Sequence, residues 1–326
     1  MINRLKVVFI AEYPGERPAK LAYGLRRNGV SCLLLHLADL NFNTATYFDY
    51  SIRCHSPAEC VEIAKRINPD IIHIFSFHTD ETALAVNQNL NCKIIYDYKD
   101  TFENVIAHPI DPLLWKGQRT LIERADGLCC RDRQIDHYCQ VNKINPCGKR
   151  ILFLDYCYGT DLALMPKLRE PDEIHVVLHG SFIPEDVYPQ FSCNGFYLIA
   201  EAFILQKVHL HIYPGIWAAN ALEGKQNSIY KQLEQSSPYF HIHDSLGLED
   251  LLKTISQYDF GLILYQSEIF GIPDHYVLDG HHAYGMSTRL FDYLESGLNV
   301  LVQDNFKMVV DLLQQYKFGQ VVDRTY

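Results

Sequence analysis

Short runs of apolar residues recur along this chain, and within each run polar and apolar residues do not alternate. Lys6–Ile10, Ile71–Phe75 and Gly127–Cys130 are such runs in the first half, and Phe260–Leu264 and Asn299–Val302 are two in the second. A strand without alternation is buried on both faces, as in a parallel sheet covered by helices. Segments with helical periodicity separate the runs, and such an order makes βαβ units. The sequence therefore predicts an α/β protein with doubly wound parallel sheets.

Two of the helices carry recognisable end signals. The segment Arg17–Asn28 is followed by Gly29, a residue that commonly ends a helix because it tolerates a left-handed backbone. Ser56 precedes Pro57 and stands three residues before Glu59, which is the pattern of a capping box with proline in the first turn. We therefore expect helices that begin near residue 17 and at residue 57.

The length of 326 residues fits two domains. The alternating pattern pauses where Pro166 and Pro171 bracket a charged stretch and then resumes. We therefore predict an N-terminal Rossmann-like domain over 1–165 and a C-terminal one over 166–326. Ligands of such sheets bind beyond the carboxyl ends of the strands, so we expect the two domains to face a central cleft.

Charge and cysteine content exclude several classes of protein. The net charge is −10, and all of the acidic excess lies in residues 166–326, which hold 10 Lys and Arg against 20 Asp and Glu. A nucleic-acid binder would show a basic surface, so no nucleic-acid partner is expected. None of the ten cysteines forms a C-x-x-C pair, which argues against zinc ribbons and thioredoxin-like sites. We expect a cytoplasmic protein, and peripheral association with the inner membrane surface stays open.

Two segments could bind an anion at the start of a helix, where backbone N–H groups are unpaired. The first is the turn Tyr13–Arg17, which contains Gly15, and the alternative is a plain strand-to-helix turn. The second is Gly285–Val300, in which Ser287 or Thr288 can cap a helix that begins with Arg289 and ends at Gly297. Arg289 could donate paired hydrogen bonds to a diphosphate, and Asp292 could accept from sugar hydroxyls. The alternative is a capped amphipathic helix with an incidental arginine.

Two further patterns allow more than one interpretation. Asp97 and Lys99 follow a buried strand and could both point into the cleft, or they could belong to a solvated loop. The pairs His209/His211 and His241/His243 lie on expected strands, so each pair faces one way and could ligate a metal. Such pairs are more often histidines in the core or on a sheet face with local partners, and we assign no metal ligand.

The order of segments resembles the GT-B glycosyltransferases, in particular the large family 4 with its two Rossmann-like domains. Gly285–Val302 is similar to the helix that binds the donor in that family, and Ile95–Asp100 resembles its acidic stretch after the fourth strand. Further similar segments are Pro69–Phe75, Arg124–Gly127, Tyr158–Leu162 and Ser256–Leu264. The resemblance covers nearly the whole chain.

The resemblance implies a metal-independent, retaining transfer of a sugar from a UDP- or GDP-type nucleotide sugar to a sugar, lipid-linked or protein acceptor, with no cofactor. It implies catalytic roles for three residues, which are Asp97, Lys99 and Asp292. The residues implied to bind the donor diphosphate are Gly15, Gly180, Ser181, Ser287, Thr288 and Arg289. Asp244 and Leu246 would contact the nucleotide, and Ser76 and His78 would face the acceptor.

Several departures from the family pattern support a second interpretation. Lys99 stands where the family has a histidine, Tyr284 stands where it has the first donor-site acid, and Asn194 lies near an expected lysine. Only one helix, Phe306–Tyr316, and one short strand are expected near the end, so the final helices of the second domain would be missing or shortened. The chain could therefore be a catalytically degenerate binding or stabilising subunit of a partner transferase, or a homo-oligomer. A sugar-nucleotide epimerase is a third alternative.

Overall fold

The structure is a computed structural model. It describes residues 4–11, 16–38, 43–75, 80–98, 112–155, 157, 162–168, 172–180, 182, 184, 186, 196–223, 225, 228–264 and 281–323.

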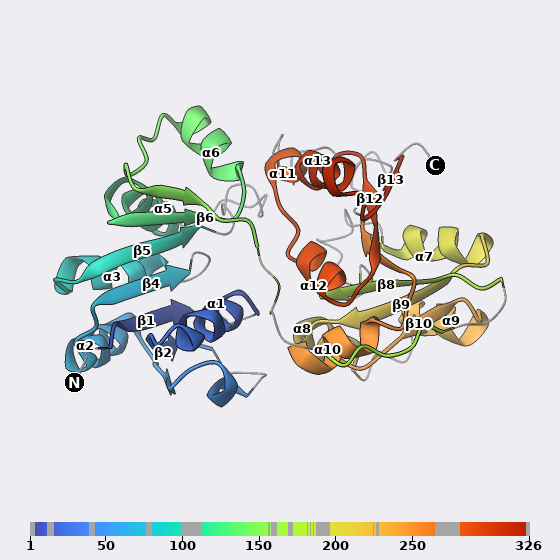
Figure 1. Ribbon diagram of the computed structural model, residues 1–326, viewed down its shortest axis with the longest axis horizontal. Helices are drawn as coiled ribbons and strands as arrows, with labels where there is room; N and C mark the ends of the chain where they lie inside the picture. The colour runs from blue at the N-terminus through green and yellow to red at the C-terminus, as the bar shows by residue number, and fades with distance from the viewer. Residues whose placement is uncertain are drawn as a thin grey trace. The chain divides into compact units, whose positions relative to one another are not determined.

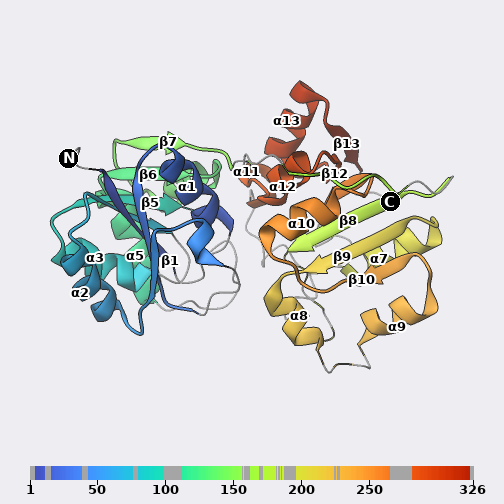
Figure 2. The same cartoon turned by 60° about the horizontal axis from the view of Figure 1, so that its bottom comes forward.

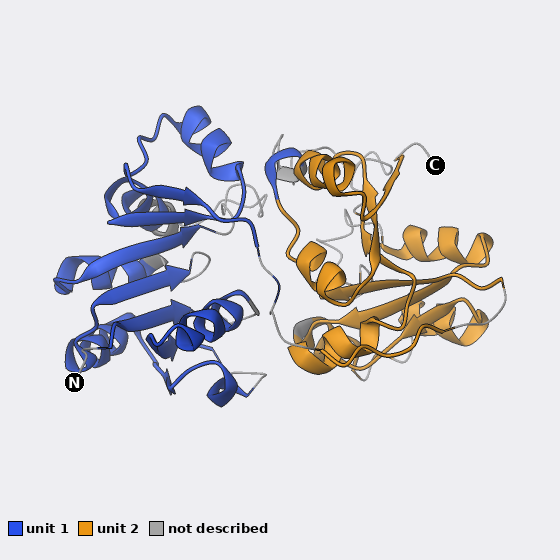
Figure 3. Ribbon diagram, viewed as in Figure 1, with its two compact units in different colours: residues 1–158, 275–285 blue, residues 159–274, 286–326 orange. Residues whose placement is uncertain are grey.

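The chain divides into two compact units (Figure 3). Unit 1 comprises residues 1–158 and 275–285, and unit 2 comprises residues 159–274 and 286–326. The division falls a few residues before the expected boundary at 165. The return of the chain to unit 1 is anchored by Tyr284, whose carbonyl accepts a hydrogen bond from the backbone N–H of Arg133 at 3.1 Å and whose ring stacks on His137.

Unit 1 is built on a parallel sheet whose described strands pair in the order β3-β2-β1-β4-β5-β6-β7 (Figure 1). Its strands are β1 (Lys6–Ala11), β2 (Ser31–His36), β3 (Tyr50–Arg53), β4 (Ile71–Phe75), β5 (Lys93–Tyr98), β6 (Gly127–Cys130) and β7 (Arg150–Leu152). Its helices are α1 (Glu16–Arg27), η1 (Thr44–Thr46), α2 (Pro57–Ile67), α3 (Asp80–Asn89), α5 (Pro112–Arg124), α6 (Gln134–Asn142) and α11 (His281–Tyr284).

Unit 2 is a second parallel sheet whose described strands pair in the order β10-β9-β8-β11-β12-β13. Its strands are β8 (His175–Gly180), β9 (His209–Pro214), β10 (Phe240–Ile242), β11 (Phe260–Ile263), β12 (Asn299–Gln303) and β13 (Gly319–Val322). Its helices are α7 (Phe196–Leu205), α8 (Ile216–Leu222), α9 (Ile229–Ser236), α10 (Leu248–Ile255), α12 (Arg289–Glu295) and α13 (Lys307–Tyr316). The prediction of an α/β protein with two doubly wound parallel sheets is confirmed.

The local signals in the sequence form as expected. Ser56 accepts a hydrogen bond from the N–H of Glu59 at 3.2 Å, and the Glu59 carboxylate accepts one from the N–H of His55 at 2.7 Å, so the capping box closes one residue earlier than the standard pattern. Gly29 follows α1 with a left-handed φ of 81°. These contacts fix where α1 ends and α2 begins.

Period-2 alternation assigns each strand residue in the middle of unit 2 to one of two faces. Val176, Leu178, Leu210 and Ile212 form a buried cluster with residues of α7, α8 and α9. Figure 2 shows α8 and α9 on one side of this sheet and α10 and α12 on the other. The residues between the cluster members therefore face α10 and α12, and on β8 and β9 most of these residues are histidines.

Candidate functional site

Each sheet has one point at which the strand order reverses. In unit 2 the chain continues from β8 to β9 on one side, whereas β11 pairs with β8 on the other. In unit 1 the same reversal lies between β1 and β4. Ligands of open α/β sheets bind beyond the carboxyl ends of the strands at such switch points. Each unit therefore has a position where a ligand is expected, and the two are described separately.

The switch point of unit 2 brings together two residues that the sequence singled out. Gly180 is the last residue of β8 and has a left-handed φ of 83°. A Cβ atom at Gly180 would lie 3.8 Å from Nε of Arg289, the first residue of α12. Arg289 is buried, with 5% of its surface exposed. A guanidinium group therefore lies beside the end of β8, next to a backbone that carries no side chain.

Asp292 lies one turn after Arg289 in α12, as the sequence predicted. It has a partner that the sequence did not identify. Its carboxylate lies 3.5 Å from Nε2 of His179, and both side chains are almost completely buried. The ring of His179 also packs edge-on against Tyr293 of α12. His179 thus ties the end of β8 to α12. Its side chain faces α12 because of its place in the strand.

The start of α12 differs in detail from the prediction. Thr288 occupies the N-cap position but has helical backbone angles, and its side chain makes no capping hydrogen bond. The carbonyls of Ser287 and Thr288 instead accept from the N–H groups of Leu290 and Phe291, both at 3.2 Å. The helix ends at Glu295, two residues before Gly297, which has a φ of 70°. The first turn is therefore tight, and it is closed by backbone rather than by hydroxyl groups.

The two residues expected to contact the nucleotide lie in the loop between β10 and α10. Asp244 and Leu246 are exposed, and Leu246 retains 37% of its surface in solvent. The loop follows the carboxyl end of β10, which is separated from β8 by the single strand β9. Adjacent strands are about 4.8 Å apart, so this loop borders the same edge of the sheet as Gly180 at a distance of roughly 10 Å.

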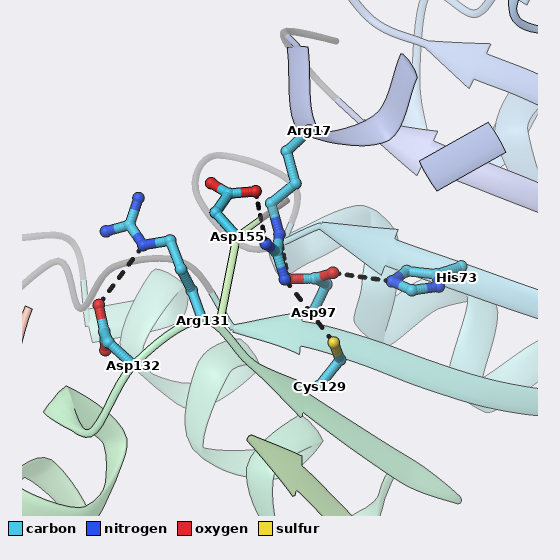
Figure 4. A network of polar contacts seen from close by, with 7 residues as sticks. All are labelled: Arg17, His73, Asp97, Cys129, Arg131, Asp132 and Asp155. Carbon is cyan, nitrogen blue, oxygen red and sulfur yellow. Dashed lines mark hydrogen bonds and ion pairs between the residues drawn. The ribbon is translucent and has the colours of Figure 1, made fainter. Parts of the chain in front are cut away.

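The carboxyl edge of unit 1 holds a buried ionic network (Figure 4). Asp97 near the end of β5 is fully buried and accepts a hydrogen bond from Nε of Arg17 at 3.0 Å. Its second oxygen lies 3.0 Å from Nε2 of His73 on β4. Arg17, from the first turn of α1, also contacts Asp155 at 3.1 Å and donates to the sulfur of Cys129 at 3.7 Å. Arg17 thus connects α1 to β5, to β6 and to the segment that follows β7.

The charges in this network set its protonation state. Burial would raise the pKa of Asp97, but the Arg17 guanidinium and the His73 hydrogen bond outweigh burial and hold the pKa below its ordinary value. Burial raises the pKa of Cys129 to about 12, so this thiol is neutral at pH 7. Asp97 is therefore an ionised carboxylate with occupied oxygens, which makes it a poor proton acceptor and a strong anchor for Arg17 and His73.

Sequence reasoning found part of this network. Asp97 was identified. Arg17 was noted only as the end of a turn and the start of a helix, and His73 and Asp155 were not identified. The available signal for His73 was a histidine within a strand that is otherwise apolar. Five predicted residues lie outside the described residues, and these are Gly15, Ser76, His78, Lys99 and Ser181.

Comparisons with known proteins place the fold. No protein-family model matches the sequence, and no curated protein matches it. Sucrose-phosphate synthase from Thermosynechococcus elongatus has a similar structure, with a TM-score of 0.68 and 11% identity over 99% of this chain and 87% of that one. Anabaena HepE in complex with UDP-glucose gives 0.59 and 12% over 94% and 82%. A putative UDP-N-acetylglucosamine 2-epimerase from Listeria monocytogenes gives 0.54 and 12% over 98% and 84%.

The chain therefore has the fold of the GT-B glycosyltransferases, as the sequence resemblance implied. The same fold supports transferases and an epimerase, so the activity must be argued from the site. Among the described helices, none combines the length and apolar character needed to cross a membrane.

Proposed function

We propose that this protein is a glycosyltransferase that moves a sugar from a nucleotide-diphosphate sugar to an acceptor, without a metal ion and with retention at the anomeric carbon. The observation that carries the proposal is the convergence of Gly180, Arg289, Asp292 and His179 at the switch point of unit 2. This is the place where ligands of such sheets bind, and it holds a guanidinium group in a half of the chain that has few other cations.

Each of these residues has a distinct part in the proposal. Arg289 donates to the diphosphate and stabilises the negative charge that develops when the bond between the anomeric carbon and the diphosphate breaks. Gly180 keeps the strand end next to Arg289 without a side chain, and Ser181 and the first turn of α12 with Ser287 and Thr288 complete the donor side. Asp292, whose carboxylate lies 3.5 Å from Nε2 of His179, accepts hydrogen bonds from hydroxyl groups of the donor sugar.

The nucleotide is assigned to unit 2 and the acceptor to unit 1. The loop with Asp244 and Leu246 receives the base and ribose of a UDP- or GDP-type donor. Unit 1 supplies the acceptor side, and there Asp97 acts through Arg17 and His73, which it orients. Lys99 is proposed as a catalytic residue, Ser76 and His78 as contacts of the acceptor, and Gly15 as a contact of the donor diphosphate.

A second candidate is a subunit that binds a nucleotide sugar without transferring it. The specific observation in its favour is that Asp97, which the family resemblance made catalytic, is fully buried and engaged with Arg17 and His73. Titration with UDP, GDP and their sugars, followed by assays of donor hydrolysis, separates the two candidates. Binding together with slow hydrolysis supports the transferase, and binding without any turnover supports the subunit. Inversion at C2 of a UDP-N-acetylhexosamine would instead identify an epimerase.

Arg289→Ala is expected to weaken nucleotide binding about 10- to 150-fold, because a hydrogen bond to a charged group contributes about 1.5–3 kcal/mol. Arg289→Lys should recover only part of the affinity, since lysine cannot donate two parallel hydrogen bonds. Isothermal titration calorimetry with UDP and GDP measures the effect.

Lys253→Ala is the matched control for this prediction, because Lys253 is an exposed cation in the last turn of α10 in the same unit. The control should bind nucleotide as the parent does. Equal affinity of Arg289→Ala and the parent would exclude Arg289 as the diphosphate contact, provided that circular dichroism shows the same fold.

A further inference from the structure

Unit 2 contains an array of five histidines on three adjacent strands. His175 is the first residue of β8, His209 and His211 lie on β9, and His241 and His243 lie on and just after β10. The register places His175 directly beside His209, and His211 beside His241. All five rings belong to the sheet face that α10 and α12 cover, and Tyr258 stacks on His211 at 4.3 Å.

The histidines of this array contact one another through their ring nitrogens. In each contact, Nδ1 of one ring faces Nε2 of the next. Nδ1 of His175 lies 2.9 Å from Nε2 of His211, and Nδ1 of His211 lies 3.0 Å from Nε2 of His243. Nδ1 of His209 likewise lies 3.0 Å from Nε2 of His241. In both His175 and His209, Nδ1 is therefore engaged by a second histidine.

The Nε2 atoms of His175 and His209 converge on one carboxylate. Nε2 of His175 and Nε2 of His209 are both buried and make no hydrogen bond in the described structure. Each lies 3.5 Å from the same oxygen of Glu173. This separation is too long for a good hydrogen bond. It matches the roughly 3.4 Å between two ligands that hold one ion tetrahedrally with bonds of about 2.1 Å.

We propose that Glu173, His175 and His209 bind a divalent transition-metal ion of the Zn²⁺ type through one carboxylate oxygen and two Nε2 atoms. Metal-bound histidines characteristically donate their other ring N–H to a partner, which fixes the tautomer and the ring orientation. His211 and His241 are such partners here. When Nδ1 of His175 and of His209 carries the proton, both Nε2 atoms present lone pairs toward Glu173.

The structure favours this ligand set over the three histidines alone. His175, His209 and His211 bring ligand nitrogens within 4.8 Å of one another. However, both ring nitrogens of His211 are already engaged, by His175 and by His243. Glu173 supplies the third ligand instead, and its partly exposed side chain provides a path from solvent. Water would take the fourth position.

The backbone around the site is fixed before an ion binds. The Asp259 carboxylate accepts a hydrogen bond from the N–H of His175 at 2.9 Å, and the N–H of Asp259 donates to the carbonyl of His175 at 2.9 Å. The N–H of His209 donates to the carbonyl of Ile174, also at 2.9 Å. Two of the ligands therefore stand at the rigid amino ends of paired strands.

This metal site is separate from the proposed donor site. His175 begins β8 and Gly180 ends it, so the two sites lie at opposite ends of the strand, roughly 16 Å apart. The ion would join the segment before β8 to β8 and β9 and would stabilise unit 2 without taking part in sugar transfer.

Titration of the chelator-treated full chain with Zn²⁺ tests the proposal. We expect one Zn²⁺ per chain by calorimetry and a higher melting temperature in its presence, since an ion that binds only the folded state stabilises it. Glu173→Gln should weaken Zn²⁺ binding at least about tenfold. This variant changes a partly exposed side chain, so its fold can be verified by circular dichroism. His209→Asn should weaken binding similarly.

Two controls sharpen the result. His55→Ala removes an exposed histidine that neighbours Glu59 in unit 1, and it should leave Zn²⁺ binding unchanged. Nucleotide affinity of Glu173→Gln should equal that of the parent, because the donor site lies at the other end of β8. The proposal is overturned if the parent binds no Zn²⁺, or if folded Glu173→Gln binds Zn²⁺ as tightly as the parent.

Discussion

Replacing Arg17 by methionine is expected to lower the free energy of unfolding of unit 1 by about 3–5 kcal/mol, because removal of one partner leaves a buried charge uncompensated. Asp97 is completely buried, and Asp155, which Arg17 also contacts, is 5% exposed. Methionine retains most of the volume of arginine, so the loss is electrostatic rather than a cavity. Of the two carboxylates, Asp97 would keep only the hydrogen bond with His73 among the contacts described above.

Urea denaturation measures this loss in unit 1 specifically. The chain has two tryptophans, Trp115 in α5 and Trp217 in α8, so a Trp217→Phe background leaves one fluorescent reporter in unit 1. Lys93→Met is the matched control, because it breaks the exposed pair between Lys93 and Asp126, which should contribute less than about 1 kcal/mol. Equal losses in the two variants would show that the buried network does not stabilise unit 1.

The parent and Arg17→Met should also differ in how the free energy of unfolding depends on pH. In the parent, the pKa of Asp97 lies below 3.8, so the unfolded chain takes up a proton at this position before the folded chain does. The free energy of unfolding therefore falls as the pH drops below about 4. In Arg17→Met, burial without the cation would raise the pKa of Asp97 above that of the unfolded chain, and acidification would then favour the folded state. The stability difference between parent and variant should shrink as the pH falls.

The position of Asp97 also shows what the sequence could predict in unit 1. Strand β5 and the location of Asp97 near its carboxyl end followed from an apolar run and its end. The partner could not be predicted, since Arg17 lies 80 residues away and meets Asp97 only through the order in which the strands assemble. Asp97 faces α1, and its carboxylate is paired with Arg17 of that helix. Local patterns identify a polar residue at a sheet edge, but they do not say whether it is already paired.

In unit 2, too, the sequence predicted the faces of the strands but not the register between them. Period-2 alternation correctly predicted that His209 and His211 share a face, as do His241 and His243. It did not predict that His175 stands beside His209, because the alternation within one strand does not say which of its residues pairs with which residue of the neighbouring strand. His179 escaped notice for a similar reason, since its contact with Asp292 joins β8 to a helix more than one hundred residues later. Arg289 and Asp292 were named from the pattern of a helix start, and Gly180 was named from the family resemblance. Arg289 begins α12, and Asp292 lies one turn into it.

Gly261→Ala is expected to lower the free energy of unfolding of unit 2 by about 3 kcal/mol, at the upper end of the cost of overpacking a core. A Cβ atom at Gly261 in β11 would lie 2.2 Å from Cγ of Tyr293, and this ring atom is too close to the α12 backbone to move aside alone. Tyr293 is completely buried, its hydroxyl group donates to the carbonyl of Leu262, and its ring packs against His179. The added methyl group must therefore displace α12 from the sheet.

The same displacement links packing to the proposed donor site. Arg289 and Asp292 lie on α12, so a helix moved outward carries both away from Gly180 and His179. Nucleotide affinity of Gly261→Ala should thus fall about tenfold or more, although residue 261 is not proposed to touch the nucleotide. Gly24→Ala is the control of opposite sign, since nothing lies within 4 Å of its Cβ position and alanine favours the helix by about 0.5–1 kcal/mol. Urea denaturation followed by Trp217 in a Trp115→Phe background, together with calorimetry, gives both quantities for Gly261→Ala. Gly24 lies in unit 1, so Trp115 in a Trp217→Phe background reports the stability of Gly24→Ala. If Gly261→Ala loses stability but keeps full nucleotide affinity, then the close contact between α12 and β11 does not position Arg289.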